Sequence, residues 1–565
     1  MDAGAPASRA SSGDVIAQAR AWLAQDPDPQ TRAELEDLLA RAEGDEGARA
    51  DLADRFGSRL AFGTAGLRGE LGAGPNRMNR VLVAQAAAGF ASYLRERADE
   101  GVTPSVVIGY DGRRNSDVFA RDSAEVFAGA GLRAILLPRL LPTPVLAFAV
   151  RHLGADAGVM VTASHNPPDD NGYKVYLGGA DEGAQIVSPA DAQISAHIVR
   201  VAAEIPVSRL PRSLGYESAP ESVVDAYVAA TAAVSPAPET AAGMRWVYTA
   251  MHGVGWDTLA RILASASYPE PVLVERQIEP DPAFPTVAFP NPEEPGAMDL
   301  AYEAARAADA EFVVANDPDA DRLAVAVPAD VEGGWRALSG NEVGLLLGWR
   351  AARLAREAGA VPGASLACSL VSSPGLRAIA GHYGLDFHET LTGFKWISRA
   401  PGLIYGFEEA LGYLVNPGTV RDKDGLSATV ALLGLAAEAR GRGSSLAGLV
   451  DELTAQFGHF ASGQVSVRVE DVRVIADIMA RLRRQPPAEL AGVHVTRIDD
   501  LLRGDGDLPR GDVLRVWLDD GSRVIVRPSG TEPKLKVYLD VRGDTAEDAR
   551  SRIAALDAAA RALVG

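Results

Sequence analysis

The chain has 565 residues, 47% of them hydrophobic and 23% charged, which is the composition of a globular protein too long for a single hydrophobic core. At roughly 100–200 residues per domain, this length predicts about four domains. The net charge of −20 argues against electrostatic binding of nucleic acid or of an anionic membrane. The single cysteine, Cys368, excludes internal disulfides and cysteine-based zinc sites and fits a reducing compartment.

The N-terminal residues and the apolar segments indicate a soluble protein. Residues 1–14 are small and polar and lack the apolar core of a secretory signal. No run reaches the ~18 apolar residues of a membrane-spanning helix. We therefore expect a cytoplasmic protein that does not bind membranes or nucleic acid.

Predicted elements begin with a helical region at 15–56, which carries apolar residues at helical spacing and which we expect to pack on the first domain. Strands are then predicted at 105–109, 132–137 and 157–161, and helices at 119–128 and 144–153. Such alternation is typical of a parallel sheet with right-handed crossovers, in which ligands bind at the carboxyl ends of strands. The alternation continues with strands at 246–250, 311–315, 365–370 and 403–405 and helices at 342–357 and 426–437.

From about Gly463 the pattern changes to short alternating strands, at 465–469, 513–518, 523–526 and 536–541, with helices at 472–482 and 545–563. The sequence thus predicts an α/β protein: three successive α/β domains with mixed, mostly parallel sheets, and a C-terminal α+β domain, arranged around one central cleft. We place an N-terminal helical arm at 1–60 and the four domains at 61–210, 211–330, 331–460 and 461–565.

The stretch 159–176, VMVTASHNPPDDNGYKVY, contains a candidate nucleophile. Its strand ends at a turn carrying Ser164 and His165, and two prolines and the Asn171-Gly172 pair then predict a stiff, exposed loop before Lys174. A serine placed in this way suits a role as a reacting group, although the same pattern also fits an ordinary serine in a surface turn. The surrounding residues do not form a G-x-S-x-G elbow, so acyl transfer is not indicated.

Three aspartates, Asp317, Asp319 and Asp321, lie between two apolar runs. Their carboxylates converge only if a cation cancels their repulsion, and a hard divalent cation such as Mg²⁺ with oxygen ligands does so. An EF-hand is excluded, because Arg322 stands where its loop needs glycine and Pro328 where it needs glutamate. The spacing favours a metal site over a solvated acidic turn.

Three further segments carry candidate binding residues. In RPSGTEPKLK, 527–536, the backbone amides of small residues around Gly530 can bind an anion, with Arg527 and a lysine adding positive charge. The alternative is a β-hairpin with cationic flanks. FGTAGLRG, 62–69, is a glycine-rich loop whose Arg68 suits a phosphate or is simply solvated. The pair Glu408-Glu409 ends a predicted strand. It suits general acid–base chemistry or hydrogen bonds from sugar hydroxyls, and the alternative is an exposed pair of carboxylates.

Together, a metal loop, a serine loop, a carboxylate loop and an anion loop distributed over four domains describe a site for a phosphorylated polyol. A nucleotide phosphate is not indicated, because the chain contains no G-x-x-x-x-G-K-[ST] sequence.

The segments TASHNPPDDNGYK, DPDADR, GFEEALGY with RDKDG, and RPSGTEPK, in this order, resemble the α-D-phosphohexomutase superfamily, which includes phosphoglucomutases and phosphomannomutases. FGTAGLRG and the helical arm are similar to the branch that includes phosphopentomutases and bisphosphate-forming relatives. The resemblance implies an isomerase, an intramolecular phosphotransferase that interconverts the 1-phosphate and 6-phosphate of glucose or mannose through a phosphoserine and a sugar bisphosphate. It further implies Mg²⁺ and a sugar 1,6-bisphosphate activator, and we expect a monomer or homodimer.

The resemblance also implies roles for individual residues. Ser164 carries the phosphoryl group and joins Asp317, Asp319 and Asp321 in holding Mg²⁺. The reacting centre is lined by Arg68, His165, Lys174 and Arg322, with Lys174 a candidate general base. The sugar is bound by Glu408, Lys395 and Lys423, and the phosphate that is not reacting by Arg527, Ser529, Gly530, Thr531 and Lys536.

One position departs from the pattern of the superfamily. Its members usually have a serine two residues after the sugar-binding glutamate, and here that residue is Ala410, which leaves the ring preference open. A phosphopentomutase or a bisphosphate-forming relative is therefore the alternative within the superfamily. From other classes, a metal-dependent sugar phosphatase or a catalytically silent sugar-phosphate sensor would use the same residues.

Overall fold

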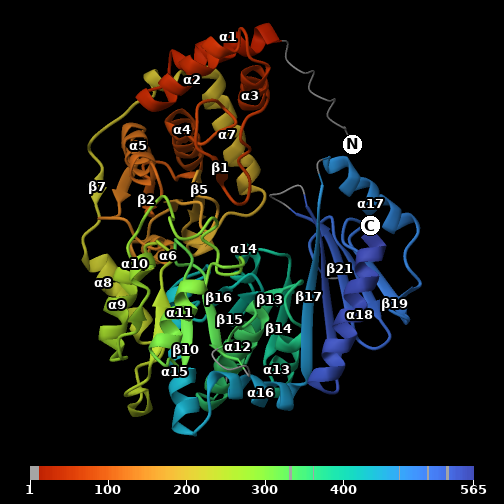
Figure 1. Ribbon diagram of the computed structural model, residues 1–565. Coiled ribbons are helices and arrows are strands. Elements are labelled where there is room, and N and C mark those ends of the chain that lie inside the picture. The colour runs from red at the N-terminus through yellow and green to blue at the C-terminus, as the bar shows by residue number, and fades with distance from the viewer. Residues whose placement is uncertain are drawn as a thin grey trace. The chain divides into compact units, whose positions relative to one another are not determined.

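The computed structural model describes residues 12–329, 334–359, 362–469, 471–505, 508–529 and 534–564 (Figure 1). Within these residues the chain forms two compact units. Unit 1 comprises residues 12–236, 243–323 and 418–430, and unit 2 comprises residues 237–242, 324–417 and 431–564. No helix among the described residues is long and apolar enough to cross a membrane.

Unit 1 begins with three helices, α1 (Ser12–Leu23), α2 (Pro29–Arg41) and α3 (Glu46–Gly57), coloured red in Figure 1. The carboxylates of Asp28 and Asp45 cap α2 and α3 by accepting hydrogen bonds from N–H groups of the first turn. Buried side chains such as Leu35 and Leu52 belong to the same hydrophobic core as the first sheet. The predicted helical region is therefore a three-helix layer that shares the core of the first sheet.

The first sheet has the strand order β1-β5-β4-β2-β3-β7, with β6 paired to β5. Its parallel strands are β4 (Ala157–Val161), β2 (Ser105–Tyr110), β3 (Arg133–Leu136) and β7 (Glu217–Ser218). Its antiparallel strands are β1 (Leu67–Glu70), β5 (Asp170–Leu177) and β6 (Ala184–Gln185). The accompanying helices are α4 (Arg80–Arg97), α5 (Ser116–Gly129), α6 (Thr143–His152), α7 (Ala190–Glu204) and α8 (Ser222–Ala232), with 3₁₀ turns η1 (Gly179–Asp181) and η2 (Val207–Arg209).

A second set of parallel strands in unit 1 carries the aspartates. It comprises β9 (Val272–Leu273), β8 (Trp246–Thr249) and β10 (Phe312–Ala315), with helices α9 (Gly255–Ala266), α10 (Glu275–Ile278) and α11 (Asp299–Ala307). All four residues of β8 and of β10 are buried, as expected for central strands of a parallel sheet covered on both faces.

Two local predictions for unit 1 are wrong. The Asn171-Gly172 pair does not lie in an exposed loop, because both residues are buried in β5, where the Asn171 amide donates to Arg114 O. Gly172 is needed there for packing, since a Cβ would lie 2.5 Å from Thr162 O. Arg68 lies on strand β1 and not in the glycine-rich turn that precedes it.

Unit 2 contains the hairpin β11 (Ala324–Pro328) and β12 (Trp335–Ala337) and a four-stranded sheet of order β14-β13-β15-β16. The sheet comprises β13 (Ser365–Ser369), β14 (Asp386–Thr390), β15 (Leu403–Glu408) and β16 (Gly412–Leu414), and only β16 is antiparallel. The helices are α12 (Gly340–Glu357), α13 (Gly375–Tyr383), α14 (Phe394–Ile397), α15 (Gly425–Gly441) and α16 (Leu446–Phe457), and η3 (Glu239–Ala241) is a 3₁₀ turn.

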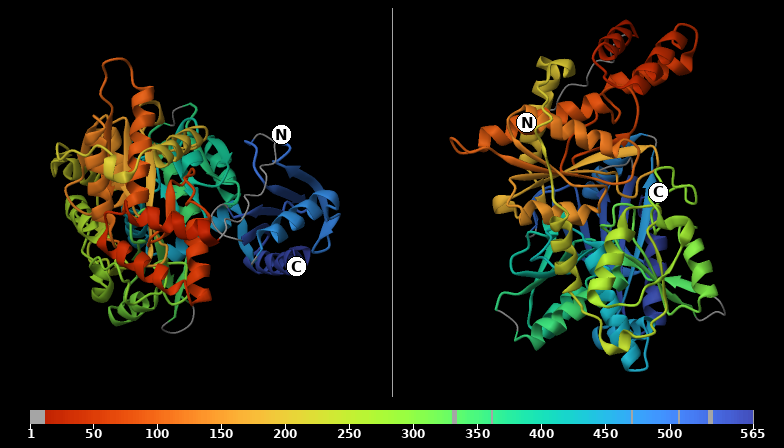
Figure 2. Two further views of the ribbon diagram at one scale, coloured as in Figure 1. Left: turned by 90° about the horizontal axis from the view of Figure 1, so that it is seen from above. Right: turned by 90° about the vertical axis from the view of Figure 1, so that its left-hand side faces the viewer.

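The C-terminal part of unit 2 is an antiparallel sheet of order β17-β22-β21-β20-β19-β18, drawn in blue in Figure 2. It comprises β17 (His459–Arg468), β18 (Glu489–Leu490), β19 (Val493–Asp500), β20 (Leu514–Leu518), β21 (Arg523–Pro528) and β22 (Lys534–Gly543), with helices α17 (Val472–Arg484) and α18 (Ala546–Val564). Apolar residues of both helices share one core with alternate residues of β20, β21 and β22. The predicted fold class is confirmed, with parallel strands in three α/β sheets and a C-terminal α+β domain, while the common cleft stays a prediction.

Candidate active site

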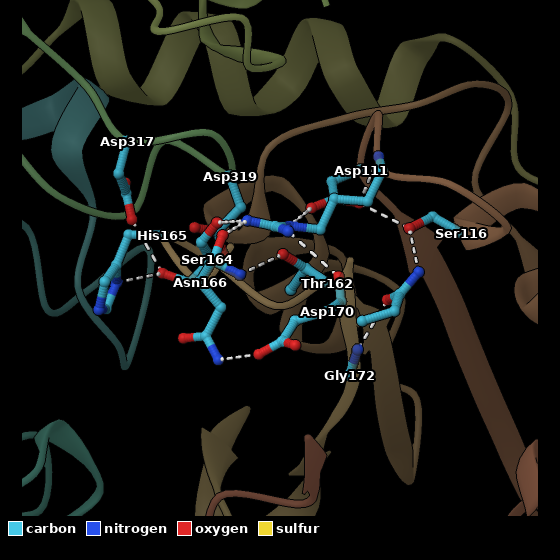
Figure 3. A network of polar contacts seen from close by, with 12 residues as sticks. Asp111, Ser116, Thr162, Ser164, His165, Asn166, Asp170, Gly172, Asp317 and Asp319 are labelled. Atoms are coloured by element: carbon cyan, nitrogen blue, oxygen red, sulfur yellow. Dashed lines mark hydrogen bonds and ion pairs between the residues drawn. The ribbon is translucent and has the colours of Figure 1, made fainter. Parts of the chain in front are cut away.

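Ser164 lies three residues after Val161, the last residue of strand β4, and is almost fully buried. Its hydroxyl donates a hydrogen bond to Asp317 Oδ2 at 2.9 Å, and its oxygen lies 3.2 Å from His165 Nδ1 (Figure 3). The serine and the first aspartate, which are 153 positions apart in sequence, therefore meet at the ends of β4 and β10.

The backbone of Ser164 is held in an uncommon conformation. Its φ of 53° lies in the left-handed region, which costs a residue with a Cβ about 1 kcal/mol or more. The Thr162 hydroxyl accepts a hydrogen bond from the Ser164 N–H at 2.9 Å and helps to stabilise the turn. This turn directs the hydroxyl of Ser164 to Asp317.

The three aspartates converge as predicted. One carboxylate oxygen of each lies within 4.8 Å of the other two, and all three residues are buried. The loop is closed by Asn316, whose amide donates to Arg322 O at 2.7 Å, and by Thr143 at the start of α6, whose hydroxyl donates to Asp319 Oδ2 at 2.5 Å.

Positively charged side chains lie close to these carboxylates. Lys174 on β5 donates from Nζ to Asp319 Oδ2 at 2.7 Å and to Asp321 Oδ2 at 2.9 Å, and Lys423 Nζ lies 3.3 Å from Asp321 Oδ2. Arg322 Nε lies 3.8 Å from carboxylate oxygens of Asp317 and of Asp321. Each side chain of this cluster is at most 14% exposed, so the charges interact in a medium that screens them weakly.

These charges set the proton affinities of the cluster. Burial, together with the charges of Asp319 and Asp321, raises the pKa of Asp317 well above its ordinary value. Burial acts in the same direction on Asp321, but Lys174, Lys423 and Arg322 outweigh it and lower the pKa of that carboxyl. Burial lowers the pKa of Lys174, but Asp319 and Asp321 outweigh it, so that the net pKa is raised and the side chain is an ammonium.

The oxygen atoms of this cluster fit the ligands of a divalent cation. Asp319 Oδ1 and Asp321 Oδ1 are buried and accept no hydrogen bond from any described residue. Buried oxygens without hydrogen-bond donors are costly unless a cation binds them, and three carboxylates suit Mg²⁺. Asp317, Asp319, Asp321 and the oxygen of Ser164 are the groups that would hold the ion.

Two further residues predicted for the reacting centre lie beside Ser164. The Arg68 guanidinium donates from Nη1 to Asn166 Oδ1 at 3.2 Å, and burial lowers its pKa against the opposing charge of Asp319. Burial, with the charges of Arg322 and Arg68, lowers the pKa of His165 well below its ordinary value, so that its ring is neutral at physiological pH. The structure thus brings Arg68, His165, Lys174 and Arg322 together around Ser164 and the aspartates.

Lys423 belongs to a segment, 418–430, that forms part of unit 1. Buried tyrosines hold this segment: Tyr176 donates to Asp422 Oδ2 at 3.0 Å, and Tyr227 donates to Asp424 Oδ1 at 2.9 Å. Lys423 forms ion pairs with Asp321 and with Asp422, whose Oδ1 lies 3.6 Å from its Nζ, whereas the sequence assigns it to the sugar, and that role stays a prediction.

In unit 2, Glu408 is the last residue of strand β15 and Glu409 follows it. Glu409 Oε2 accepts hydrogen bonds from the hydroxyls of Ser369 at 3.1 Å and Ser372 at 3.0 Å. These contacts fix Glu409 to the end of β13 and to the loop that follows it, and the role of Glu408 as a sugar ligand stays a prediction. Lys395 lies on the short helix α14 of the same unit.

The predicted phosphate-binding residues lie on two adjacent strands of unit 2. Arg527 on β21 is directly opposite Lys536 on β22, and two neighbouring positive charges favour an anion. Arg527 hydrogen-bonds to the phenol of Tyr538, whose pKa is raised by burial and by Glu409. The Ser529 N–H donates to Lys534 O at 2.8 Å, while Gly530 and Thr531 lie outside the described residues.

Sequence reasoning missed several residues that shape the site. Thr143 and Thr162 bind Asp319 and the Ser164 backbone, and Arg113 binds the loop after Ser164. Arg113 follows β2 in the run Asp111–Arg114, and a charged run at the carboxyl end of a parallel strand was the available signal. No comparable signal marks a threonine.

Comparisons with known proteins identify the family of this chain. Models of the phosphoglucomutase/phosphomannomutase family match in order: alpha/beta/alpha domain I at residues 59–204, domain II at 225–332, domain III at 339–457 and the C-terminal domain at 465–557.

Relatives match along most of the chain. It is 54% identical over 487 residues to a probable phosphomannomutase of Haemophilus influenzae, covering 86% of this chain and 98% of that protein. It is 35% identical over 512 residues to a phosphoglucomutase of Staphylococcus epidermidis, covering 86% of this chain and 91% of that protein. It is 36% identical over 563 residues to a human phosphopentomutase, covering 92% of this chain and 90% of that protein.

A solved structure of a putative phosphomannomutase from Thermus thermophilus superimposes with a TM-score of 0.67 at 26% identity, covering 90% of this chain and 99% of that one. Four domain models matched in order and a relative 54% identical over most of both chains show that this chain belongs to the phosphoglucomutase/phosphomannomutase family of the α-D-phosphohexomutase superfamily and is a mutase.

Proposed function

We propose that this protein interconverts the 1-phosphate and 6-phosphate of a hexose, with mannose and glucose phosphates as its substrates. The observation that carries the proposal is the 2.9 Å hydrogen bond from the Ser164 hydroxyl to Asp317, within a cluster of buried carboxylates that fits Mg²⁺. The relative with 54% identity is named as a probable phosphomannomutase, which supports a hexose in preference to a pentose.

In this proposal Ser164 carries the phosphoryl group. The phosphorus–oxygen bond to Ser164 breaks as a bond forms to the free hydroxyl of the sugar monophosphate, which yields a sugar bisphosphate. The bisphosphate then turns over, and its other phosphoryl group returns to Ser164. When bound by Asp317, Asp319 and Asp321, Mg²⁺ supplies positive charge for the transferring phosphoryl oxygens.

The chain's own residues do the remaining work. Arg68 and Arg322 lie beside the carboxylates as fixed guanidinium groups that neutralise phosphoryl charge. Lys174 is our candidate for moving the proton. As an ammonium paired with Asp319 and Asp321, it gives a proton to the departing oxygen of Ser164 and takes the proton that the attacking sugar hydroxyl loses. Glu408, Lys395 and Lys423 are proposed to bind sugar hydroxyls.

The phosphate that is not reacting is assigned to Arg527, Ser529, Gly530, Thr531 and Lys536. The cross-strand pairing of Arg527 with Lys536 supports this assignment, because both side chains lie on one face of the β21–β22 pair. We further propose that a sugar 1,6-bisphosphate activates the enzyme by phosphorylating Ser164 when that hydroxyl is free. The domain boundaries, a cytoplasmic location and a monomeric or homodimeric state stay predictions.

The test is a substrate panel. Purified protein with Mg²⁺ and a trace of hexose 1,6-bisphosphate is given the 1-phosphates of mannose, glucose and ribose, and both the 6- or 5-phosphate product and inorganic phosphate are measured. We expect turnover of mannose and glucose 1-phosphates without release of phosphate. Preference for ribose 1-phosphate would indicate a phosphopentomutase, phosphate release a phosphatase, and binding without turnover a sensor.

A further inference from the structure

Arg113 is buried beneath the loop that carries Ser164. It follows strand β2, and its side chain is only 1% exposed. A buried arginine keeps its charge, so its guanidinium needs hydrogen-bond acceptors inside the protein. Among the described residues, the oxygens that accept hydrogen bonds from its guanidinium all lie in one segment of the chain.

The guanidinium donates to four main-chain carbonyl oxygens of the segment 164–170. Nη2 donates to Ser164 O and to Asn166 O, both at 2.6 Å, and Nη1 donates to Pro167 O at 2.8 Å and to Asp170 O at 3.1 Å. The guanidinium of arginine presents five N–H donors in a fixed planar fork, whereas the ammonium of lysine presents three and cannot bind four carbonyls.

Other residues fix the guanidinium itself. Its carbon lies 5.0 Å from the centre of the Phe284 ring, a cation–π contact with a residue that is 2% exposed. Asp111 Oδ2 lies 3.7 Å from Arg113 Nε, and Asp111 also accepts hydrogen bonds from Ser116 Oγ and from the N–H of Arg113. The guanidinium is thus held between an aromatic ring and a carboxylate.

The hydrogen bonds of Arg113 stabilise the strained backbone of Ser164. A non-glycine residue with φ near 53° keeps that conformation only where the surrounding contacts determine it. Arg113 binds the carbonyl of Ser164 itself and those of three of the next six residues. The bonds therefore fix the angle at which the hydroxyl of Ser164 leaves the turn.

We propose that Arg113 is a positioning residue for phosphoryl transfer: it holds the Ser164 loop in its reactive conformation through four carbonyls. It acts through the loop and does not touch the substrate. This inference rests on the proposed role of Ser164 as the phosphoryl carrier.

The test compares Arg113→Lys and Phe284→Leu with a control, Arg121→Lys. Arg121 lies nearby on α5, is about half exposed and pairs with Asp117 one helical turn away. Hydrogen exchange of the peptide spanning 162–172 reports the loop directly, and kcat and KM report turnover.

Arg113→Lys should speed amide exchange in residues 163–170 by about tenfold or more, since buried hydrogen bonds to a charged group are lost. It should also lower kcat by about 100-fold with KM changed less than about threefold, because misplacement of a reacting group impairs chemistry more than binding. Phe284→Leu should shift both quantities in the same direction by less, and Arg121→Lys should shift neither.

The proposal would be overturned if Arg113→Lys left loop exchange and kcat at wild-type values. It would also be overturned if the variant lost thermal stability while the folded fraction kept its normal kcat, as a purely structural arginine would. Failure of the proposed function gives a different result, since the wild-type protein itself would then show no mutase activity, whereas loop exchange would still respond to Arg113.

Discussion

Removal of the Lys174 ammonium tests the electrostatics of the aspartate cluster. Lys174→Met keeps most of the side-chain length but leaves Asp319 and Asp321 without the ammonium that they contact at 2.7 and 2.9 Å. Breaking a buried ion pair by deleting one partner costs about 3–5 kcal/mol, because the remaining charge stays buried. In metal-free protein we expect a loss of stability of that size in unit 1.

Magnesium should reverse this loss. In the wild-type protein the ammonium of Lys174 bonds the same two carboxylates through their Oδ2 atoms and repels a cation at the Oδ1 atoms, and the variant lacks this repulsion. A ligand at 100 times its Kd stabilises the folded state by about 2.7 kcal/mol, and a tighter Kd adds to that value. The stabilisation by Mg²⁺ should therefore be larger in Lys174→Met than in the wild-type protein.

The assay is urea unfolding followed by circular dichroism, in EDTA and in Mg²⁺, for both proteins. Lys395→Met, which makes the same chemical change in unit 2, is the matched control and should respond to Mg²⁺ as the wild-type protein does. Equal stabilisation of wild-type protein and Lys174→Met by Mg²⁺ would refute the reasoning, as would metal-free Lys174→Met of unchanged stability.

Three further predictions follow from the site and the core. Arg527→Ala should raise KM for the sugar phosphate about tenfold or more with little loss of global stability, and an unchanged KM in steady-state kinetics would contradict the phosphate role. EDTA should abolish turnover in a coupled assay and Mg²⁺ should restore it; activity indifferent to the chelator would exclude the aspartate site. Burial raises the pKa of Tyr173 and Tyr248 above the ordinary value of 10, so the folded state retains phenol protons that the unfolded state releases. The free energy of unfolding should therefore fall as the pH rises above 10, by up to about 1.4 kcal/mol per pH unit for each tyrosine. Urea midpoints measured from pH 9 to 11.5 should therefore fall, with tyrosinate absorbance appearing only on unfolding, and a flat profile would show that these tyrosines ionise while folded.

The main features of the fold were predictable from patterns with a direct physical cause. Short β-branched runs followed by polar turns marked β2, β4 and β10, and parallel strands place their carboxyl ends at one edge. The repulsion among three closely spaced aspartates predicted a cation, and the structure brings their oxygens within 4.8 Å of one another.

Long-range pairing was harder to predict. The Asn171-Gly172 pair has turn chemistry, but the Asn171 amide finds Arg114 O and Ser116 Oγ inside the protein, so the pair is part of a buried strand. The partners of Arg113 lie more than 50 positions away, and no local pattern reveals a set of carbonyls that form after folding.

One compositional signal would have improved the prediction. Of the 55 lysines and arginines only five are lysines, and all of them lie in predicted site segments: Lys174, Lys395, Lys423, Lys534 and Lys536. Elsewhere the chain uses arginine for positive charge. A compact ammonium differs from a planar guanidinium in size and donor geometry, so lysine marks positions where arginine does not fit.

The central claim is that Ser164 accepts and donates a phosphoryl group. The direct measurement is peptide mass spectrometry of the protein after incubation with Mg²⁺ and a hexose 1,6-bisphosphate, before and after addition of the hexose monophosphate. We expect phosphate on the peptide containing Ser164, its loss when monophosphate is added in excess, and no labelling of Ser164→Ala. Mutase turnover with that serine unmodified, or equal turnover by Ser164→Ala, would contradict the account.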